Sequence, residues 1–174
     1  MKDAFATLME KKDKKNVDGY VILQGNSDVK QPTLLYPLLQ FDGGSEPNPG
    51  PSTGGAVLFK TDRKTKIFEV GDYVEYSTNN QAEYYGLWLG LTKCIELGYK
   101  EILIEGDSQL IIKQVCGEWK IKDSTLQQLH SVITKLIKQN FEFVGIKHVL
   151  REFNKDADAI TNEVMKTKEG LFRQ

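Results

Sequence analysis

The chain has 174 residues, of which 40% are hydrophobic and 27% are charged, and its formal net charge at pH 7 is −1. This length fits one domain with a sizeable core, and the composition is that of an ordinary globular protein. The absence of a large positive charge argues against a non-specific nucleic-acid coat protein, but not against a nuclease with a locally basic face.

The first part of the chain, residues 1–32, is expected to form an N-terminal extension of uncertain structure. Its start, MKDAFATLMEKKDKK, places charges where a signal peptide would be apolar, and no apolar run approaches the ~20 residues that span a bilayer. We therefore expect an intracellular protein, cytoplasmic or nuclear, without a membrane partner. Residues 1–10 could form a short helix, residues 11–15 are a charge run, and Tyr20–Gln24 could form a strand. We favour a solvated extension over a basic arm that touches phosphates.

From residue 33 to 174 the pattern predicts one compact α/β domain. LLYPLLQFD predicts an apolar strand, GGSEPNPGPSTGG a long turn, and AVLFK and KIFEVGDYVEYS two further strands joined by a charged turn at Asp62–Lys64. EILIEGD and FEFVGIKHV predict the last two strands. The order of these elements indicates a mixed five-stranded sheet with helices packed on both faces.

Four helices are expected between and after these strands. Thr78–Asn80 offers capping side chains for AEYYGLWLGLTKCIELG, which ends at Gly98. DSQLIIKQVCG predicts a second helix that Gly117 ends, and Ser124 is expected to cap a third with one apolar face. KDADAITNEVMK predicts the last helix.

Carboxylates fall at four junctions between these elements. They lie at the end of the first strand, one turn into the first long helix, after the fourth strand and in the first turn of the last helix: Asp42, Glu83, Asp107 and Asp158. Functional groups of α/β folds tend to lie at strand ends, and four converging acids would repel one another without a cation. Mg²⁺ accepts such oxygen ligands. Taken singly, each acid could equally be a helix-dipole residue, a cap, a turn former or a solvated charge.

The segments around these acids resemble the four motifs of type 1 ribonucleases H. FDGGSEPNPGPSTGGAVL is similar to the family's opening, STNNQAEYYGL to its second motif with a metal-binding Glu, IEGDSQLIIKQ to its third, and REFNKDADAITNE to its Asn-x-x-Ala-Asp motif. The four motifs follow the family's order over roughly Leu34–Met165, so the resemblance is highly specific. It implies the ribonuclease H-like fold for this domain.

The resemblance implies an endonuclease that hydrolyses the RNA strand of RNA–DNA hybrids and leaves 5′-phosphate and 3′-hydroxyl ends. It implies two Mg²⁺ ions per site, with Mn²⁺ possible, held by four residues that are also catalytic: Asp42, Glu83, Asp107 and Asp158. No organic cofactor is expected, and the chain is expected to be a monomer. Two alternatives stay open: a catalytically weak or silent nucleic-acid-binding domain, and a nuclease of the same fold that acts on double-stranded RNA.

Substrate contacts are also implied by the resemblance. The family's minor-groove contacts correspond here to three amide side chains, and backbone amides of the first turn could add contacts to the RNA strand: Asn48, Asn80 and Gln109, then Gly43, Gly44 and Ser45. Amide side chains both donate and accept, which suits 2′-hydroxyls. For Asn48 and Asn80 the alternative is turn formation and helix capping, which can coexist with binding.

The connection before the last helix, HVLREFNKDAD, is short and lacks the histidine-bearing loop of some relatives. In this it is similar to plant and archaeal members of the family. We interpret His148 as a strand residue, with the loop histidine of those relatives as the alternative. The similarity to short-loop members implies that Arg151 or Glu152 lies near the metals. Asp156 is expected to be a surface charge, because the motif register favours Asp158 as the ligand.

The sequence also supports expectations about the basic protrusion, Trp119, Glu105 and the two cysteines. The segment around the end of the second helix has few basic residues, so the family's basic protrusion is missing: Lys113, Lys120 and Lys122. We therefore expect weak binding of nucleic acid that falls strongly with added salt. Trp119 either stacks along the DNA strand or belongs to the core. Glu105 is expected to be solvated, with an outer contact to a metal as the alternative. The two cysteines are expected to be buried thiols: Cys94 and Cys116.

Overall fold

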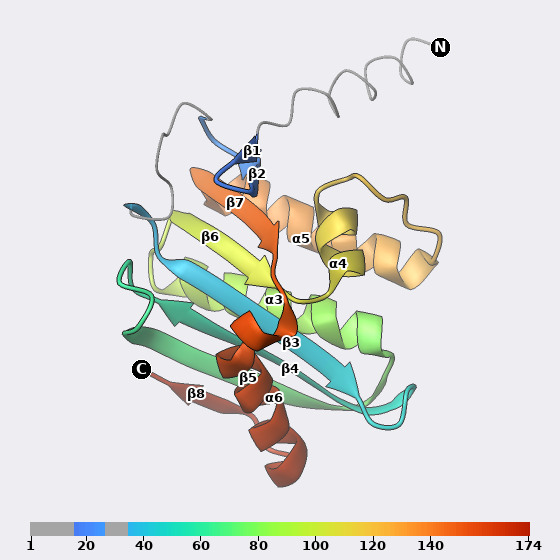
Figure 1. Cartoon of the computed structure of the whole chain (residues 1–174). Helices are drawn as coiled ribbons and strands as arrows, with labels where there is room; N and C mark the ends of the chain where they lie inside the picture. Colours follow the sequence, from blue (N-terminus) through green and yellow to red (C-terminus); the bar gives the residue numbers. More distant parts are fainter. Residues whose placement is uncertain (1–15, 27–34) are drawn as a thin grey trace.

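The computed structural model describes residues 16–26 and 35–174 and shows a twisted sheet flanked by helices (Figure 1). The helix expected at residues 1–10 and the charge run at 11–15 lie outside the described residues. The strands are β1 (Asn16–Val17), β2 (Tyr20–Gln24), β3 (Leu38–Ser45), β4 (Gly50–Phe59), β5 (Lys66–Ser77), β6 (Glu101–Gly106), β7 (Phe143–His148) and β8 (Leu171–Arg173). The helices are α3 (Asn79–Glu96), α4 (Gln109–Val115), α5 (Ser124–Asn140), the 3₁₀ turn η1 (Arg151–Phe153) and α6 (Lys155–Thr167).

The sheet has eight strands in the order β1-β2-β7-β6-β3-β4-β5-β8, not the five that were predicted. The five predicted strands are its central β7-β6-β3-β4-β5, and short strands extend both edges. β6 runs parallel to β3 and β7 while the other neighbours are antiparallel, so the predicted mixed sheet is confirmed. β2 has the bounds of the strand expected at Tyr20–Gln24, and because it pairs with β7 this stretch is not the solvated extension that we favoured. β1 and β8 have two and three residues and carry no periodic signal. The division of the chain at residue 32 stays a prediction.

The glycine-rich segment after the first strand forms a much shorter turn than predicted. β3 and β4 pair from Leu38↔Phe59 to Ser45↔Ser52, so residues 46–49 alone make the turn. The glycines lie inside the strands because α3 packs directly on their backbone. A Cβ at Gly43 would lie 2.1 Å from the Ala82 carbonyl oxygen, and one at Gly86 would lie 2.1 Å from the Asp42 carbonyl oxygen. Backbone therefore touches backbone where β3 crosses α3.

Caps at the helix starts follow the sequence with one exception. Thr78 and Gln81 form a capping box at α3, in which Gln81 N donates to Thr78 Oγ1 at 3.2 Å and Thr78 N donates to Gln81 Oε1 at 3.1 Å. At α5 the N-cap is Asp123, whose Oδ1 accepts from the amide of Leu126, and Ser124 is the first helical residue. Both residue types cap well, so the sequence could not decide between adjacent positions.

Helices cover both faces of the sheet, as predicted. Leu39 and Phe41 of β3 pack in one cluster with α3, α4 and α5, whereas Leu38 packs in a second cluster with Ile160 and Val164 of α6. Because side chains alternate along a strand, Gln40 and Asp42 also lie on the α6 face. The cysteines are buried in the first cluster: Cys94 and Cys116. Within the described parts of the chain, no helix has the length and apolar character needed to cross a membrane.

Candidate active site

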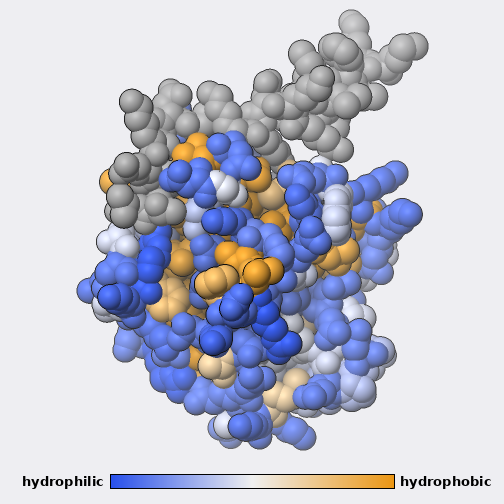
Figure 2. All heavy atoms as spheres, in the orientation of Figure 1, coloured by the Kyte–Doolittle hydropathy of each residue, from blue (hydrophilic) through white to orange (hydrophobic). Residues whose placement is uncertain are grey.

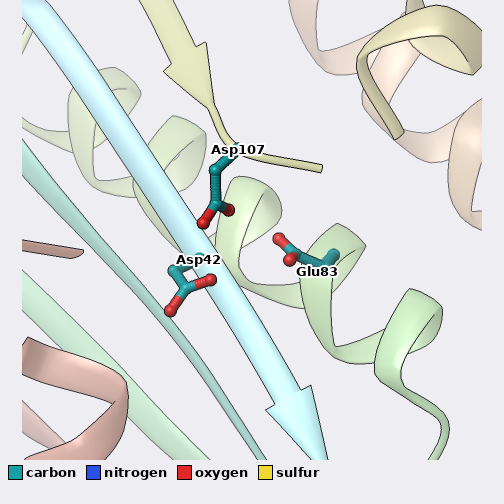
Figure 3. Close-up of side chains that lie close together, drawn as sticks. All are labelled: Asp42, Glu83 and Asp107. Carbon is teal, nitrogen blue, oxygen red and sulfur yellow. The ribbon is translucent and has the colours of Figure 1, made fainter. Parts of the chain in front are cut away.

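Three carboxylates meet where β3, β6 and α3 come together. One oxygen each from Asp42, Glu83 and Asp107 lies within 4.8 Å of the other two, and Figure 3 shows the three side chains pointing toward one another. Asp42 and Asp107 are neighbours because β3 and β6 are parallel and pair through Phe41↔Gly106. Glu83 joins them because the close backbone contact at Gly43 brings that turn of α3 onto β3.

Asp42 and Glu83 lie in an environment that disfavours negative charge. Asp42 is 8% exposed and Glu83 is 9% exposed. Burial, followed by the negative charge of Asp107, raises the pKa of Asp42 to about 6. Burial, followed by the charges of Asp42 and Asp107, raises the pKa of Glu83 well above its ordinary value. These residues need a positive partner to be ionised together at neutral pH.

Glu83 supplies a direct test of whether a cation fits. Its Oε2 atom is buried, and no donor among residues 16–26 and 35–174 bonds to it. A buried carboxylate oxygen without a donor is costly unless a cation completes its environment. The donor set consists of carboxylate oxygens, the ligands that Mg²⁺ and Mn²⁺ prefer. The site therefore fits a hard divalent cation.

The fourth predicted acid, Asp158, lies in the first turn of α6 and lines the same cleft, outside the group of three. Its Oδ1 lies 3.6 Å from Arg151 Nη2, and its Oδ2 accepts from Asn162 Nδ2 at 3.3 Å. Asp156 forms an ion pair of 3.3 Å with Lys66 at the surface, which confirms its expected role. The motif register thus separated the cleft residue from its neighbour correctly.

Two residues that the sequence did not single out tie α6 to β3. Thr161 Oγ1 donates to Asp42 Oδ2 at 2.9 Å and also lies 2.9 Å from the carbonyl oxygen of Asp158. Asn154, which is fully buried, donates from Nδ2 to the carbonyl oxygen of Phe41 at 2.9 Å. The signal for Asn154 was its place in the Asn-x-x-Ala-Asp motif. Thr161 follows Asp158 by three residues and so faces the same side of the helix.

A cleft of about 540 Å³ opens over the carboxylates. Four of the six predicted substrate contacts line it: Gly43, Gly44, Ser45 and Asn80. Arg151 lines it as well. Gln109 is the exposed first residue of α4, and it does not line this cleft, although that helix follows Asp107 directly.

The turn residue Asn48 is used inside the protein. Its Oδ1 accepts from the backbone amide of Asn79 at 3.0 Å and from Ser45 Oγ at 3.2 Å. Asn79 Oδ1 in turn accepts from the backbone amide of Ser45 at 2.8 Å. The first asparagine of the pair, Asn79, therefore locks the turn to α3. Both Asn79 and Asn80 are exposed and line the cleft. The family resemblance had selected the second asparagine, Asn80, as a substrate contact, but it carried no signal for the structural role of Asn79.

Several single-residue expectations are resolved by the structure. His148 is the last residue of β7 and pairs with Gly106, which confirms that it is a strand residue, and its Nε2 lies 3.2 Å from the Asp107 carbonyl oxygen. Trp119 is 44% exposed, so the core alternative is wrong. Glu105 is not a solvated carboxylate, because it accepts hydrogen bonds from Tyr20 and from Gln40.

Comparison with known proteins gives consistent similarities. A family model described as reverse transcriptase-like matches residues 40–164. The Ribonuclease HI of Halobacterium salinarum is 39% identical over 151 residues, which cover 83% of this chain and 75% of that protein. The crystal structure of RNase H1 from the same archaeon superposes with a TM-score of 0.73 at 37% identity, covering 76% of this chain and 98% of that one.

Two further relatives extend this picture. A bifunctional protein of Mycobacterium tuberculosis is 36% identical over 128 residues, which cover 74% of this chain but 35% of that protein. The chain thus spans about a third of the length of the mycobacterial relative. The crystal structure of LC11-RNase H1 in complex with an RNA/DNA hybrid superposes with a TM-score of 0.72 at 29% identity, covering 76% of this chain and 98% of that one.

Proposed function

The chain belongs to the type 1 ribonuclease H family, and from this premise we propose that it is an endonuclease that hydrolyses the RNA strand of RNA–DNA hybrids. The observation that carries the proposal is the convergence of Asp42, Glu83 and Asp107 in a buried site. Holding these acids together destabilises the fold, and such groups cluster at functional sites. A domain that only binds nucleic acid gains nothing from this loss of stability. The products would carry 5′-phosphate and 3′-hydroxyl ends.

The proposed cofactor is Mg²⁺, with Mn²⁺ possible, and two ions per site would be held by Asp42, Glu83, Asp107 and Asp158. When bound, such ions neutralise phosphate charge, activate a water and stabilise the leaving oxygen. The buried Oε2 of Glu83, which has no hydrogen-bond partner in the described part of the chain, and the raised pKa of Asp42 support this assignment. Asp158, at the more open edge of the cleft, would complete the ligand set.

The remaining groups of the cleft position the substrate. Arg151 has an 80% exposed side chain beside Asp158 and would bind a phosphate of the RNA strand. Asn80 is exposed at the cleft and can exchange hydrogen bonds with a 2′-hydroxyl. We include Gly43 and Gly44 as places where the RNA backbone comes close to the protein.

Contacts outside the cleft would widen the footprint on the hybrid. Gln109 and the Nδ2 group of Asn48 are proposed to touch the minor groove beside the scissile phosphate. All proposed metal ligands come from one chain, so a monomer would suffice for cleavage. We propose an intracellular location, cytoplasmic or nuclear, where such hybrids arise.

Cleavage of end-labelled RNA tests the proposal. The wild type is incubated with an RNA–DNA hybrid or with double-stranded RNA, in Mg²⁺, in Mn²⁺ or in EDTA. We expect internal cuts in the hybrid alone, only with metal, and none with Asp107→Asn. The matched control is Asp156→Asn, which removes an exposed carboxylate of α6 outside the cleft and should cut normally.

Three other results of this cleavage assay would contradict the proposal. A folded wild type that cuts nothing with either metal would refute the nuclease and favour the silent binding domain. Equal cutting of double-stranded RNA would refute hybrid specificity. Cutting that survives in Asp107→Asn would mean that the carboxylate cluster is not the active site.

A further inference from the structure

We propose that the N-terminal β1–β2 hairpin positions the active-site connection Arg151–Asn154, through Tyr20, Glu105 and Gln40. These three side chains, named here the Tyr20 relay, are positioning residues rather than catalytic ones. The inference rests on the proposed nuclease function, because it concerns a segment of that cleft. Tyr20 lies outside residues 40–164, the part that matches the family model. The relay would therefore give a role to a part of the chain that precedes the residues matched by the family model.

Tyr20 is firmly docked on the sheet. β2 pairs with β7 through Val21↔Ile146, and Tyr20 is 2% exposed. Its side chain crosses β7 beside Gly145, where a Cβ would already lie 3.3 Å from the Tyr20 Cβ. Lys147 places its Nζ 5.3 Å from the centre of the Tyr20 ring, a favourable cation–π contact. The hairpin thus places the tyrosine hydroxyl beside β6, the strand on the far side of β7.

The hydroxyl begins a chain of hydrogen bonds toward the cleft. Tyr20 donates to Glu105 Oε2, and burial followed by this bond raises the pKa of Tyr20, so that it stays a donor. Glu105 Oε1 accepts from Gln40 Nε2 at 3.0 Å, across the register pair of β3 and β6. The same Nε2 donates to the carbonyl oxygen of Phe153 at 2.9 Å. Both N–H groups of the Gln40 amide are therefore used, and Glu105 fixes its orientation.

The 3₁₀ turn η1, which receives this bond, is held by few buried contacts of its own side chains. η1 has no buried residue, and Leu150 and Phe153 are 60% and 62% exposed. In Figure 2 apolar atoms gather near the middle of the visible face, over the region where β7 leads to α6 in Figure 1. Side-chain packing therefore does not fix η1. Two inward hydrogen bonds tie it to β3, from Gln40 to Phe153 O and from the buried Asn154 to Phe41 O, and the Arg151–Asp158 ion pair links it to α6.

This connection carries a group of the cleft. Arg151 begins η1, lines the cleft and lies 3.6 Å from Asp158. Release of the Phe153 carbonyl would let η1 move and shift the guanidinium relative to Asp158. Displacements of about 1 Å in such positioning groups can lower turnover strongly. The rest of the hybrid would still bind through contacts elsewhere, so its affinity would change little. We therefore expect a lower kcat with a nearly unchanged KM.

Hydrogen exchange tests the relay without any need for catalysis. The variants are Tyr20→Phe, Gln40→Met and the two combined. The matched control is Tyr85→Phe, since Tyr85 also donates to a carboxylate, Asp72 Oδ2 at 2.6 Å, but away from the cleft. In Tyr20→Phe we expect amides of residues 149–154 to exchange about 5- to 30-fold faster, the loss expected for one hydrogen bond. Tyr85→Phe should leave that segment unchanged.

The double variant and steady-state kinetics complete the test. If Tyr20 acts through Gln40, Tyr20→Phe adds nothing to the exchange of residues 149–154 once Gln40→Met is present. For hybrid cleavage, Tyr20→Phe should lower kcat about 3- to 30-fold and leave KM within about twofold of wild type.

The outcomes separate the relay from the proposed nuclease. Unchanged exchange in Tyr20→Phe, an equal rise over the whole chain, or fully additive effects in the double variant would overturn the relay. Faster exchange confined to residues 149–154 in a chain that never cuts hybrid would support the relay and refute the nuclease. Confined exchange with unchanged kcat would overturn the claim that the relay positions the active site.

Discussion

Replacing Asp42 by asparagine is expected to stabilise the metal-free protein at neutral pH while it abolishes the proposed cleavage. Asp42 is 8% exposed, and its carboxylate lies close to the negative charge of Asp107. Asparagine has nearly the same shape and can still accept the hydrogen bond from Thr161. The substitution therefore removes the charge and keeps the packing.

The magnitude follows from the pKa of Asp42, which burial raises from 3.8 to about 6. Because the folded value is the higher one, the native state holds the proton more tightly than the unfolded state. The associated stability is present in full below about pH 4 and is lost as the pH rises through about 6. A difference of about two pKa units corresponds to about 3 kcal/mol at pH 8. Asp42→Asn should recover most of this free energy of unfolding.

Urea denaturation in EDTA measures the effect at pH 5 and pH 8. We expect Asp42→Asn to raise the free energy of unfolding by about 2–3 kcal/mol at pH 8 and by less at pH 5. The control Asp156→Asn, at an exposed site, should stay within about 0.5 kcal/mol of wild type. Added Mn²⁺ should stabilise wild type more than Asp42→Asn, because binding to the native state adds to its stability.

The reasoning would be refuted by an Asp42→Asn protein that is no more stable than wild type at pH 8. A gain that is equal at both pH values would also contradict it, because it would arise from packing rather than from the titration of the carboxyl group.

Three further substitutions test the supports of the site. Thr161→Val removes the hydroxyl that orients Asp42 and should weaken Mn²⁺ binding about 10-fold by calorimetry, with recovery in Thr161→Ser; unchanged affinity would contradict this. Gly86→Ala places a Cβ 2.1 Å from the Asp42 carbonyl oxygen and should lower the free energy of unfolding by about 3 kcal/mol or more in urea, whereas a neutral effect would mean that α3 can move away. Asn154→Ala loses the buried bond to Phe41 and should cost about 1–3 kcal/mol, measured in the same way, and a smaller loss would show that water replaces the amide.

Much of the fold could be predicted because its signals are local. β5 has the predicted bounds, Lys66–Ser77, since a strand pattern between two turns depends only on neighbouring residues. The start of α3 at Thr78 was indicated by capping chemistry, which acts within one turn. The glycine-rich turn was predicted too long because the same glycines that suit a turn are needed where α3 touches β3.

The candidate site was predicted in its residue types and its location, but not in its internal bonding. Asn48 and Asn80 looked alike as substrate contacts, yet Asn48 is used inside the protein and Asn79 locks the turn. Thr161 carried no signal of its own, although it lies beside Asp42. Such pairings depend on which hydrogen-bond partners are nearest once the chain has folded.

The sequence by itself indicated on which kinds of element the four carboxylates lie, through periodicity, and proposed them as metal ligands, through the resemblance of their segments to the ribonuclease H motifs. Only the tertiary structure decided that three of these acids share one buried site, that eight strands form the sheet, and that Tyr20 reaches Glu105. Thr161 and Asp42 are 119 residues apart in sequence and 2.9 Å apart in space. Contacts of that kind are set by strand register and by backbone packing at glycines, and these depend on the whole chain at once.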